Sequence, residues 1–128
     1  MQAFSQHAIV QIQGPIQIGD LSEPEPDMLL CQLREDFYLD KKPIPSDTYL
    51  IVEVSDSTLK YDQEIKLPLY SKSGIPEYWI IDVNENQILK YTHPEGDQYL
   101  KKEIISVENS IHCNHFPEIK LNVKDILG

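Results

Sequence analysis

The stretch Tyr49-Leu-Ile-Val-Glu-Val54 decides the fold. Its almost continuous apolar character predicts a strand buried on both faces, in the middle of a sheet that is flanked by helices. The next residues, Ser55-Asp-Ser-Thr58, offer several candidate helix N-caps. A helix is therefore predicted from about Leu59 to Ser73, ended by Gly74-Ile-Pro76.

This helix is predicted to be amphipathic but irregular. Ile65, Leu69 and Tyr61 are expected on its buried face. Pro68 lies inside the helix and is expected to kink it or to split it into two shorter pieces, because proline has no N–H to donate and its ring clashes with the preceding turn.

Further strands are predicted on both sides of this unit. The segment 7–18 has the pattern of extended chain with a turn in it. Strands are predicted over 28–33, 77–83, 87–92 and 98–105, and 121–128 is expected to form a short terminal helix capped by Asn122. The fold class is therefore α/β, a mixed β-sheet with one principal helix after the central strand.

Length and composition are those of one soluble domain over residues 1–128. No apolar run is long enough to span a membrane, and the first residues do not resemble a signal peptide. Two cysteines, Cys31 and Cys113, do not form a disulfide framework, so free thiols in a reducing cytoplasm are expected. Cys31 lies in an apolar run and is predicted to be a core residue.

The charge balance argues against an extended nucleic-acid-binding surface. The formal net charge is −10, with eleven Lys and Arg residues against twenty-one acidic residues. Affinity for nucleic acid comes largely from cationic side chains that neutralise phosphates. A divalent cation in an acidic cleft reverses the sign locally, but it does not supply a long basic face.

Glu53 is the most informative candidate site residue. An unpaired carboxylate inside a buried strand costs several kcal/mol, so it must be paired, protonated, metal-bound or at an exposed strand end. Taken alone, a structural salt bridge or a solvent-exposed strand end is the simpler interpretation. Asp27, which begins the preceding strand, and Lys66, on the following helix, favour a site instead. Two carboxylates suit Mg²⁺ or Mn²⁺, and a nearby ammonium suits phosphodiester hydrolysis.

Several blocks of sequence, in order and at specific spacing, resemble one family. They are Pro26-Asp27, Val52-Glu53-Val54-Ser55-Asp-Ser-Thr-Leu, Tyr61-Asp62, Lys66, Tyr70 and Gly74-Ile-Pro-Glu-Tyr-Trp-Ile-Ile-Asp82. Together they are similar to the bacterial "putative restriction endonuclease" family of the PD-(D/E)XK nuclease superfamily, over roughly residues 15 to 100. The resemblance implies a restriction-endonuclease-like fold and a Mg²⁺-dependent or Mn²⁺-dependent endodeoxyribonuclease that hydrolyses DNA.

The same resemblance implies a role for each matching residue. Asp27 and Glu53 would be metal ligands, with the backbone carbonyl of Val54 as a further ligand. Many members of the superfamily have lysine at the position of Ser55, and here Lys66 on the next helix takes the part of that lysine. Asp62, one helical turn before Lys66, would orient its ammonium; without the family match, a surface ion pair is the simpler interpretation of these two residues.

Members of this family usually carry an N-terminal helical region before the segment that matches residues 9 to 20, and this chain lacks it. The sheet is therefore expected to have one uncovered face, which a homodimer would bury. The alternative function is a catalytically inactive nuclease-fold domain that acts as a dimeric interaction or scaffold protein. His112-Cys-Asn-His115 has the residue types of a zinc ligand pair but no second pair at suitable spacing, so a turn is the simpler interpretation.

Overall fold

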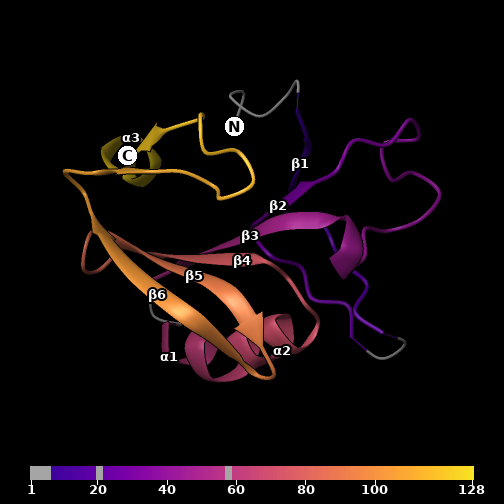
Figure 1. Ribbon diagram of the computed structural model, residues 1–128, viewed down its shortest axis with the longest axis horizontal. Helices are drawn as coiled ribbons and strands as arrows, with labels where there is room; N and C mark the ends of the chain where they lie inside the picture. The colour runs from indigo at the N-terminus through magenta and orange to yellow at the C-terminus, as the bar shows by residue number, and fades with distance from the viewer. Residues whose placement is uncertain (1–6, 20–21, 57–58) are drawn as a thin grey trace.

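A six-stranded mixed sheet organises the protein, as the computed structural model shows (Figure 1). The structure describes residues 7–19, 22–56 and 59–128, apart from the side chain of Asp62. The strands lie in sequence order and are β1 (Ile9–Ile12), β2 (Met28–Cys31), β3 (Thr48–Ser55), β4 (Glu77–Asp82), β5 (Gln87–Glu95) and β6 (Gln98–Ser106). Only β3 and β4 pair in parallel, and every other neighbouring pair is antiparallel. The predicted α/β class, with one principal helix after the central strand, is confirmed.

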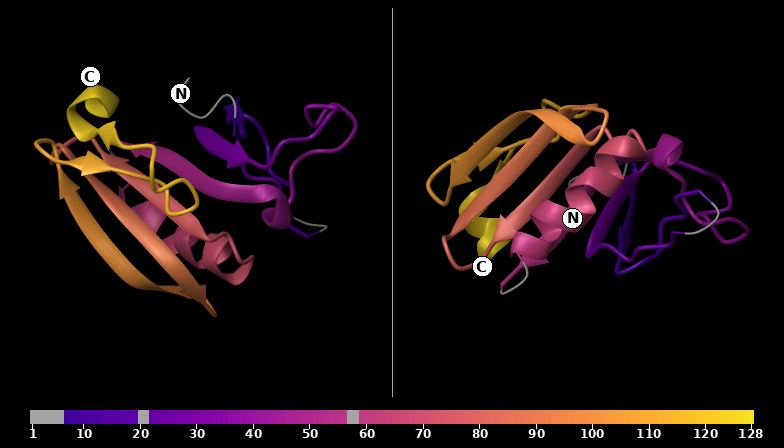
Figure 2. Two further views of the ribbon diagram at one scale, coloured as in Figure 1. Left: turned by 45° about the horizontal axis from the view of Figure 1, so that its top comes forward. Right: turned by 90° about the horizontal axis from the view of Figure 1, so that it is seen from below.

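The parallel pair requires a crossover, and the principal helix supplies it. The helix consists of α1 (Leu59–Tyr61), the π-helical segment η3 (Asp62–Lys66) and α2 (Leu67–Lys72), and it lies across one face of the sheet (Figure 2). Pro68 sits in the first turn of α2, where a missing N–H is tolerated. The helical run is continuous from Leu59 to Lys72, and its irregularity is the π-helical segment that ends two residues before Pro68. Of the predicted N-caps, Ser57 and Thr58 lie outside the described residues.

The predicted buried face of this helix is wrong for two of its three residues. Tyr61 and Ile65 are 55% and 54% exposed, whereas Leu69 packs against the core. The reason is the π-helical segment, whose wider turn changes which residues face the sheet after each turn. Leu59, Leu67 and Tyr70 contribute to the buried face instead.

Both faces of the sheet are covered, which corrects the expectation of one uncovered face. Alternate residues of each strand point to opposite faces, so β3 contributes Ile51 to one core and Val52 to the other. The first core packs under the principal helix. The second packs under the C-terminal segment, which contains β7 (Ser110–Ile111), β8 (Leu121–Asn122) and α3 (Val123–Leu127) and appears above the sheet in Figure 1. A short 3₁₀ turn, η2 (Pro45–Asp47), leads into β3.

The predicted C-terminal helix is present as α3. Asn122 occupies its N-cap position with an extended backbone, but its side chain makes no capping hydrogen bond. In the part of the chain that the structure describes, no helix combines the length and apolar character needed to cross a membrane.

Cys31 and Cys113 are free thiols in different cores. Both side chains are fully buried. Burial raises the pKa of each thiol to about 12, because a thiolate would lose its hydration. The prediction of Cys31 as a core residue is confirmed.

Candidate active site

Glu53 lies on the sheet face that the principal helix covers, and it is paired with Lys66. The side chain is only 3% exposed. The Nζ atom of Lys66 is 3.0 Å from Oε1 and 2.8 Å from Oε2 of Glu53. Lys66 is the last residue of η3, so the crossover helix places its ammonium above the central strand. The ion pair offsets the cost of taking the Glu53 carboxylate out of water.

Tyr70 supports the same carboxylate from the next turn of the helix. Its hydroxyl donates to Oε2 of Glu53 at 3.4 Å, and its ring packs edge-on against Tyr78. The sequence analysis assigned Tyr70 no role. Its spacing was the available signal, because residues four apart share a helix face and Tyr70 is four residues after Lys66.

Asp27 immediately precedes β2, at the level of Glu53. Met28 faces Val52 in the antiparallel register of β2 and β3, so the next pair along the same register is Asp27 and Glu53. The Oδ2 atom of Asp27 accepts a hydrogen bond of 2.7 Å from the backbone N–H of Val54. The carboxylate thus caps β3 where β2 no longer supplies a backbone partner. Its second oxygen, Oδ1, has no hydrogen-bond partner among the described residues.

The three other predicted site residues contribute differently. Ser55 is fully buried, and its carbonyl accepts a hydrogen bond of 3.1 Å from the N–H of Val83. The side chain of Val54 is 49% exposed, and its backbone is fixed by Asp27 and by pairing with Ile81 in β4. The side chain of Asp62 lies outside the described part of the structure.

The donor set of this site fits a hard divalent cation. Asp27 and Glu53 provide carboxylate oxygens from neighbouring strands. Within the described residues, no three His, Cys, Asp or Glu side chains come together as a complete metal cage. Two carboxylates are sufficient for Mg²⁺, which usually keeps several waters and shares its remaining positions with substrate phosphates. Asp27, Glu53 and the Val54 carbonyl are the atoms of this chain that would hold the ion.

Asp27 also borders a groove on the opposite face of the sheet. The groove has a volume of about 520 Å³, and apolar side chains of β2, β3, β4 and α3 line most of it. Neither Glu53 nor Lys66 lines it. Asp27 therefore lies at the strand end between the groove and the face that carries the ion pair.

A second buried ion pair, Glu77 with Lys90, lies under the C-terminal segment and was missed by the sequence analysis. The Nζ atom of Lys90 is 3.5 Å from Oε2 of Glu77. Lys90 also donates to the carbonyl of His112 at 2.6 Å and to Oδ1 of Asn114 at 2.8 Å. The remaining acceptor positions of Glu77 receive the indole N–H of Trp79 and, at 2.7 Å, the N–H of Asn114.

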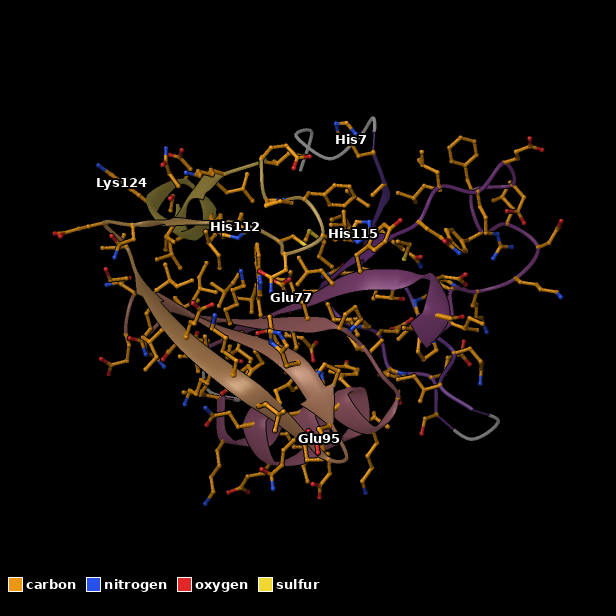
Figure 3. All side chains as sticks on the ribbon, in the orientation of Figure 1. His7, Glu77, Glu95, His112, His115 and Lys124 are labelled. Carbon is orange, nitrogen blue, oxygen red and sulfur yellow. The ribbon has the colours of Figure 1, made fainter. Side chains whose placement is uncertain are left out.

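The same contacts explain the turn predicted at His112-Cys-Asn-His115. Glu77 lies beneath the loop that carries His112 and His115 (Figure 3). His115 stacks on the ring of Tyr49 at a centroid distance of 3.9 Å. Hydrogen bonds to Glu77 and Lys90 hold this segment against the sheet.

The family model that matches the chain covers residues 2–124 and is described as Uma2, "Putative restriction endonuclease". The chain belongs to the Uma2 family. The resemblance found in the sequence is thereby confirmed, and it extends well beyond residues 15 to 100.

The fold of this Uma2 member is that of a solved nuclease-like structure. A protein from Anabaena variabilis, described as a putative nuclease belonging to DUF820, superposes with a TM-score of 0.68 at 18% sequence identity. The match covers 96% of this chain and 70% of the other chain. No curated protein sequence matches. Family and fold together identify a restriction-endonuclease-like protein, whose family generally uses divalent metals.

Proposed function

We propose that this Uma2 protein is a Mg²⁺-dependent or Mn²⁺-dependent endodeoxyribonuclease. The observation that carries the proposal is the contact of Lys66 with Glu53, at 2.8 and 3.0 Å, beside the Asp27 carboxylate that caps Val54. A cation-binding acid pair and a fixed ammonium are the parts that phosphodiester hydrolysis requires.

The proposed division of roles comes from the family resemblance, and the contacts of each residue support it. Asp27 and Glu53 would hold the divalent cation, and such an ion would supply polarisation of a phosphoryl oxygen and a more acidic bound water. Lys66 is 24% exposed, so its ammonium reaches solvent and substrate while Glu53 fixes its position. It orients the attacking water or stabilises the charge that develops on the phosphoryl group. Tyr70 holds the Glu53 carboxylate in place from behind.

The proposed substrate is DNA, and the cation helps this acidic protein approach it. At a net charge of −10 the chain repels a polyanion at long range. A bound divalent cation, together with Lys66, makes the immediate site attractive to one phosphate. We therefore expect weak overall affinity for DNA, concentrated at the scissile phosphate. A cytoplasmic location and a homodimer remain predictions.

Metal binding and cleavage, measured on the same variants, test the proposal. Saturating Mn²⁺ should stabilise the wild-type protein against urea by about 2.7 kcal/mol at 100 times its Kd. Asp27→Asn and Glu53→Gln should lose this stabilisation and the cleavage of supercoiled plasmid. Lys66→Met should lose cleavage but keep the response to metal. Glu118→Gln, which removes an exposed carboxylate outside the site and outside β6, is the matched control and should behave as wild type.

A metal response that is equal in wild type and in Asp27→Asn would contradict the proposal, as would equal cleavage in all variants. The acidity of the chain favours one alternative, a catalytically inactive nuclease-fold domain that acts as a dimeric scaffold. That alternative predicts self-association without metal-dependent stabilisation and without cleavage.

A further inference from the structure

The outer edge of β6 is the longest unpaired strand edge of the sheet. β6 extends from Gln98 to Ser106, whereas β1 at the opposite edge has only four residues. Two large apolar side chains of β6, Leu100 and Ile104, are 67% and 61% exposed. Figure 1 shows this strand at the outer edge of the sheet, on the far side of β5 from β4. Natural proteins usually shorten or block such an edge, because its free backbone groups pair with other strands.

The sequence of β6 is complementary to itself when two copies run antiparallel with Lys102 at the centre. In that register Lys101 faces Glu103 of the second copy, and the twofold axis repeats this ion pair. Leu100 faces Ile104 of the second copy, also twice. We propose that β6 pairs in this register with β6 of a second copy of the chain. The two six-stranded sheets then form one continuous sheet.

Neighbouring registers lack this complementarity. A shift that centres the pair on Glu103 places two carboxylates opposite each other and sets each Lys101 against Ile105. A shift that centres it on Lys101 places two ammonium groups opposite each other. Like charges that face directly across strands are destabilising, whereas opposite charges and apolar pairs stabilise the sheet. The charges therefore select one register out of three.

The remaining like-charge contact in the chosen register is Lys102 with its own copy. Lys102 does not extend across the edge, because its Nζ atom lies over the ring of Tyr91, 5.7 Å from the ring centroid. Lys101 and Glu103 of one chain are already near each other, with 3.7 Å between Nζ and Oε1, and both are largely exposed. Both charges are thus available to a second chain.

The contact area sets the expected strength of this dimer. One strand pair buries less surface than the roughly 1,600 Å² of a standard stable interface. The dimer should therefore form with a Kd in the micromolar range, and it should weaken as salt screens the exposed ion pairs. This inference does not depend on nuclease activity, because β6 contributes no residue to the site at Asp27, Glu53 and Lys66.

A charge exchange tests the pairing. Sedimentation equilibrium of the full chain should show a monomer–dimer equilibrium. Lys101→Glu and Glu103→Lys should each raise the Kd by about tenfold or more, because each places two like-charge pairs in the interface. The double variant Lys101→Glu, Glu103→Lys restores both ion pairs and should return the Kd to about the wild-type value. Lys41→Glu, an exposed charge reversal outside β6, is the control for net charge and should leave the Kd unchanged.

Apolar variants complete the test. Leu100→Lys should weaken the dimer, whereas Leu39→Lys, at a position that is 85% exposed in a loop, should not. Circular dichroism confirms that each variant is folded. A wild-type monomer at millimolar concentration would overturn the proposal. So would a dimer that is insensitive to the single charge reversals, or a double variant that remains as weak as the singles.

Discussion

Two buried glutamate–lysine pairs, one on each face of the sheet, have opposite surroundings. Glu53–Lys66 lies under the principal helix, and Glu77–Lys90 lies under the C-terminal segment. The lysine side chain of the first pair is 24% exposed, and that of the second is 3% exposed. Lys90 is also held by two further oxygen acceptors, the carbonyl of His112 and Oδ1 of Asn114.

The difference separates a structural pair from a candidate chemical one. Lys90 and Glu77 fix a loop, and every contact described for them is internal. The side chain of Lys66, by contrast, remains 24% exposed to solvent. Residue type and spacing do not distinguish the pairs, because both lysines follow their glutamates by thirteen residues. The surroundings of the ammonium decide what each pair does.

The largest expected effect is the loss of stability when the Glu77–Lys90 pair is broken. Lys90→Met leaves Glu77 buried without its cation and should cost about 3–5 kcal/mol in urea denaturation. Lys41→Met, at an exposed loop position, is the control and should change stability little. The double variant Glu77→Gln, Lys90→Met should recover part of the loss. A cost below about 1 kcal/mol for Lys90→Met would remove the structural assignment.

The second prediction concerns the Glu53–Lys66 pair and plasmid cleavage. The expected effect is smaller in free energy than the loss of stability at Glu77–Lys90. Lys66→Met should reduce metal-dependent plasmid cleavage by about 10²-fold or more, because it removes a cation that faces the developing charge. Its cost in stability should be well below that of Lys90→Met, since Lys66 is partly solvated. Lys72→Met, an exposed lysine of the same helix, should cleave normally. If Lys66→Met unfolded the protein as readily as Lys90→Met, the two pairs would be equivalent and the contrast would be lost.

Removal of one hydroxyl should produce a smaller effect. Tyr70→Phe deletes the contact with Glu53 and should cost about 0.5–1.5 kcal/mol of stability, together with a severalfold loss of cleavage. Tyr99→Phe is the matched control, because it removes a buried hydroxyl that donates to the carbonyl of Ile75 at 2.8 Å, away from Glu53. Tyr99→Phe should lose stability and keep cleavage. Equal cleavage in the two variants would show that Tyr70 only packs.

The rates at which the two cysteines are modified report which of the two cores becomes accessible to solvent, because each core contains one cysteine. Cys31 lies in the core that includes Tyr70, and Cys113 lies in the core under the C-terminal segment. In the native protein both thiols should react slowly with a thiol reagent at pH 8, since burial raises each pKa to about 12. Lys90→Met should accelerate the modification of Cys113 more than that of Cys31. Equal acceleration would indicate global unfolding in place of local opening.

The raised pKa values of the two thiols also predict how the free energy of unfolding changes with pH. In the unfolded chain the thiols lose their protons near the usual value of 9.0, before the folded chain does at about 12. Their contribution to stability is therefore complete below pH 9 and declines as the pH rises above 9 towards 12. Cys31→Ala, Cys113→Ala should reduce the alkaline decline in urea midpoints measured across that range, whereas Tyr38 and Tyr99, whose pKa values burial also raises, keep a part of it.

Local sequence patterns were enough to predict the sheet, the crossover helix and the family. The apolar run around Glu53 predicts a buried strand and the proline predicts an irregular helix, because both patterns reflect local rules of burial and backbone hydrogen bonding. The sequence also predicted which elements carry Asp27, Glu53 and Lys66. Their proposed roles came from the family resemblance.

The folded structure was needed to show which side chains meet. Tyr61 and Ile65 are exposed because the helix contains a π-helical turn, and the residue pattern does not predict such a turn. The C-terminal segment covers the second face of the sheet, and the Glu77–Lys90 pair lies beneath it. Burial and pairing of charges depend on contacts between segments distant in the chain, and local sequence does not encode the energy of such contacts.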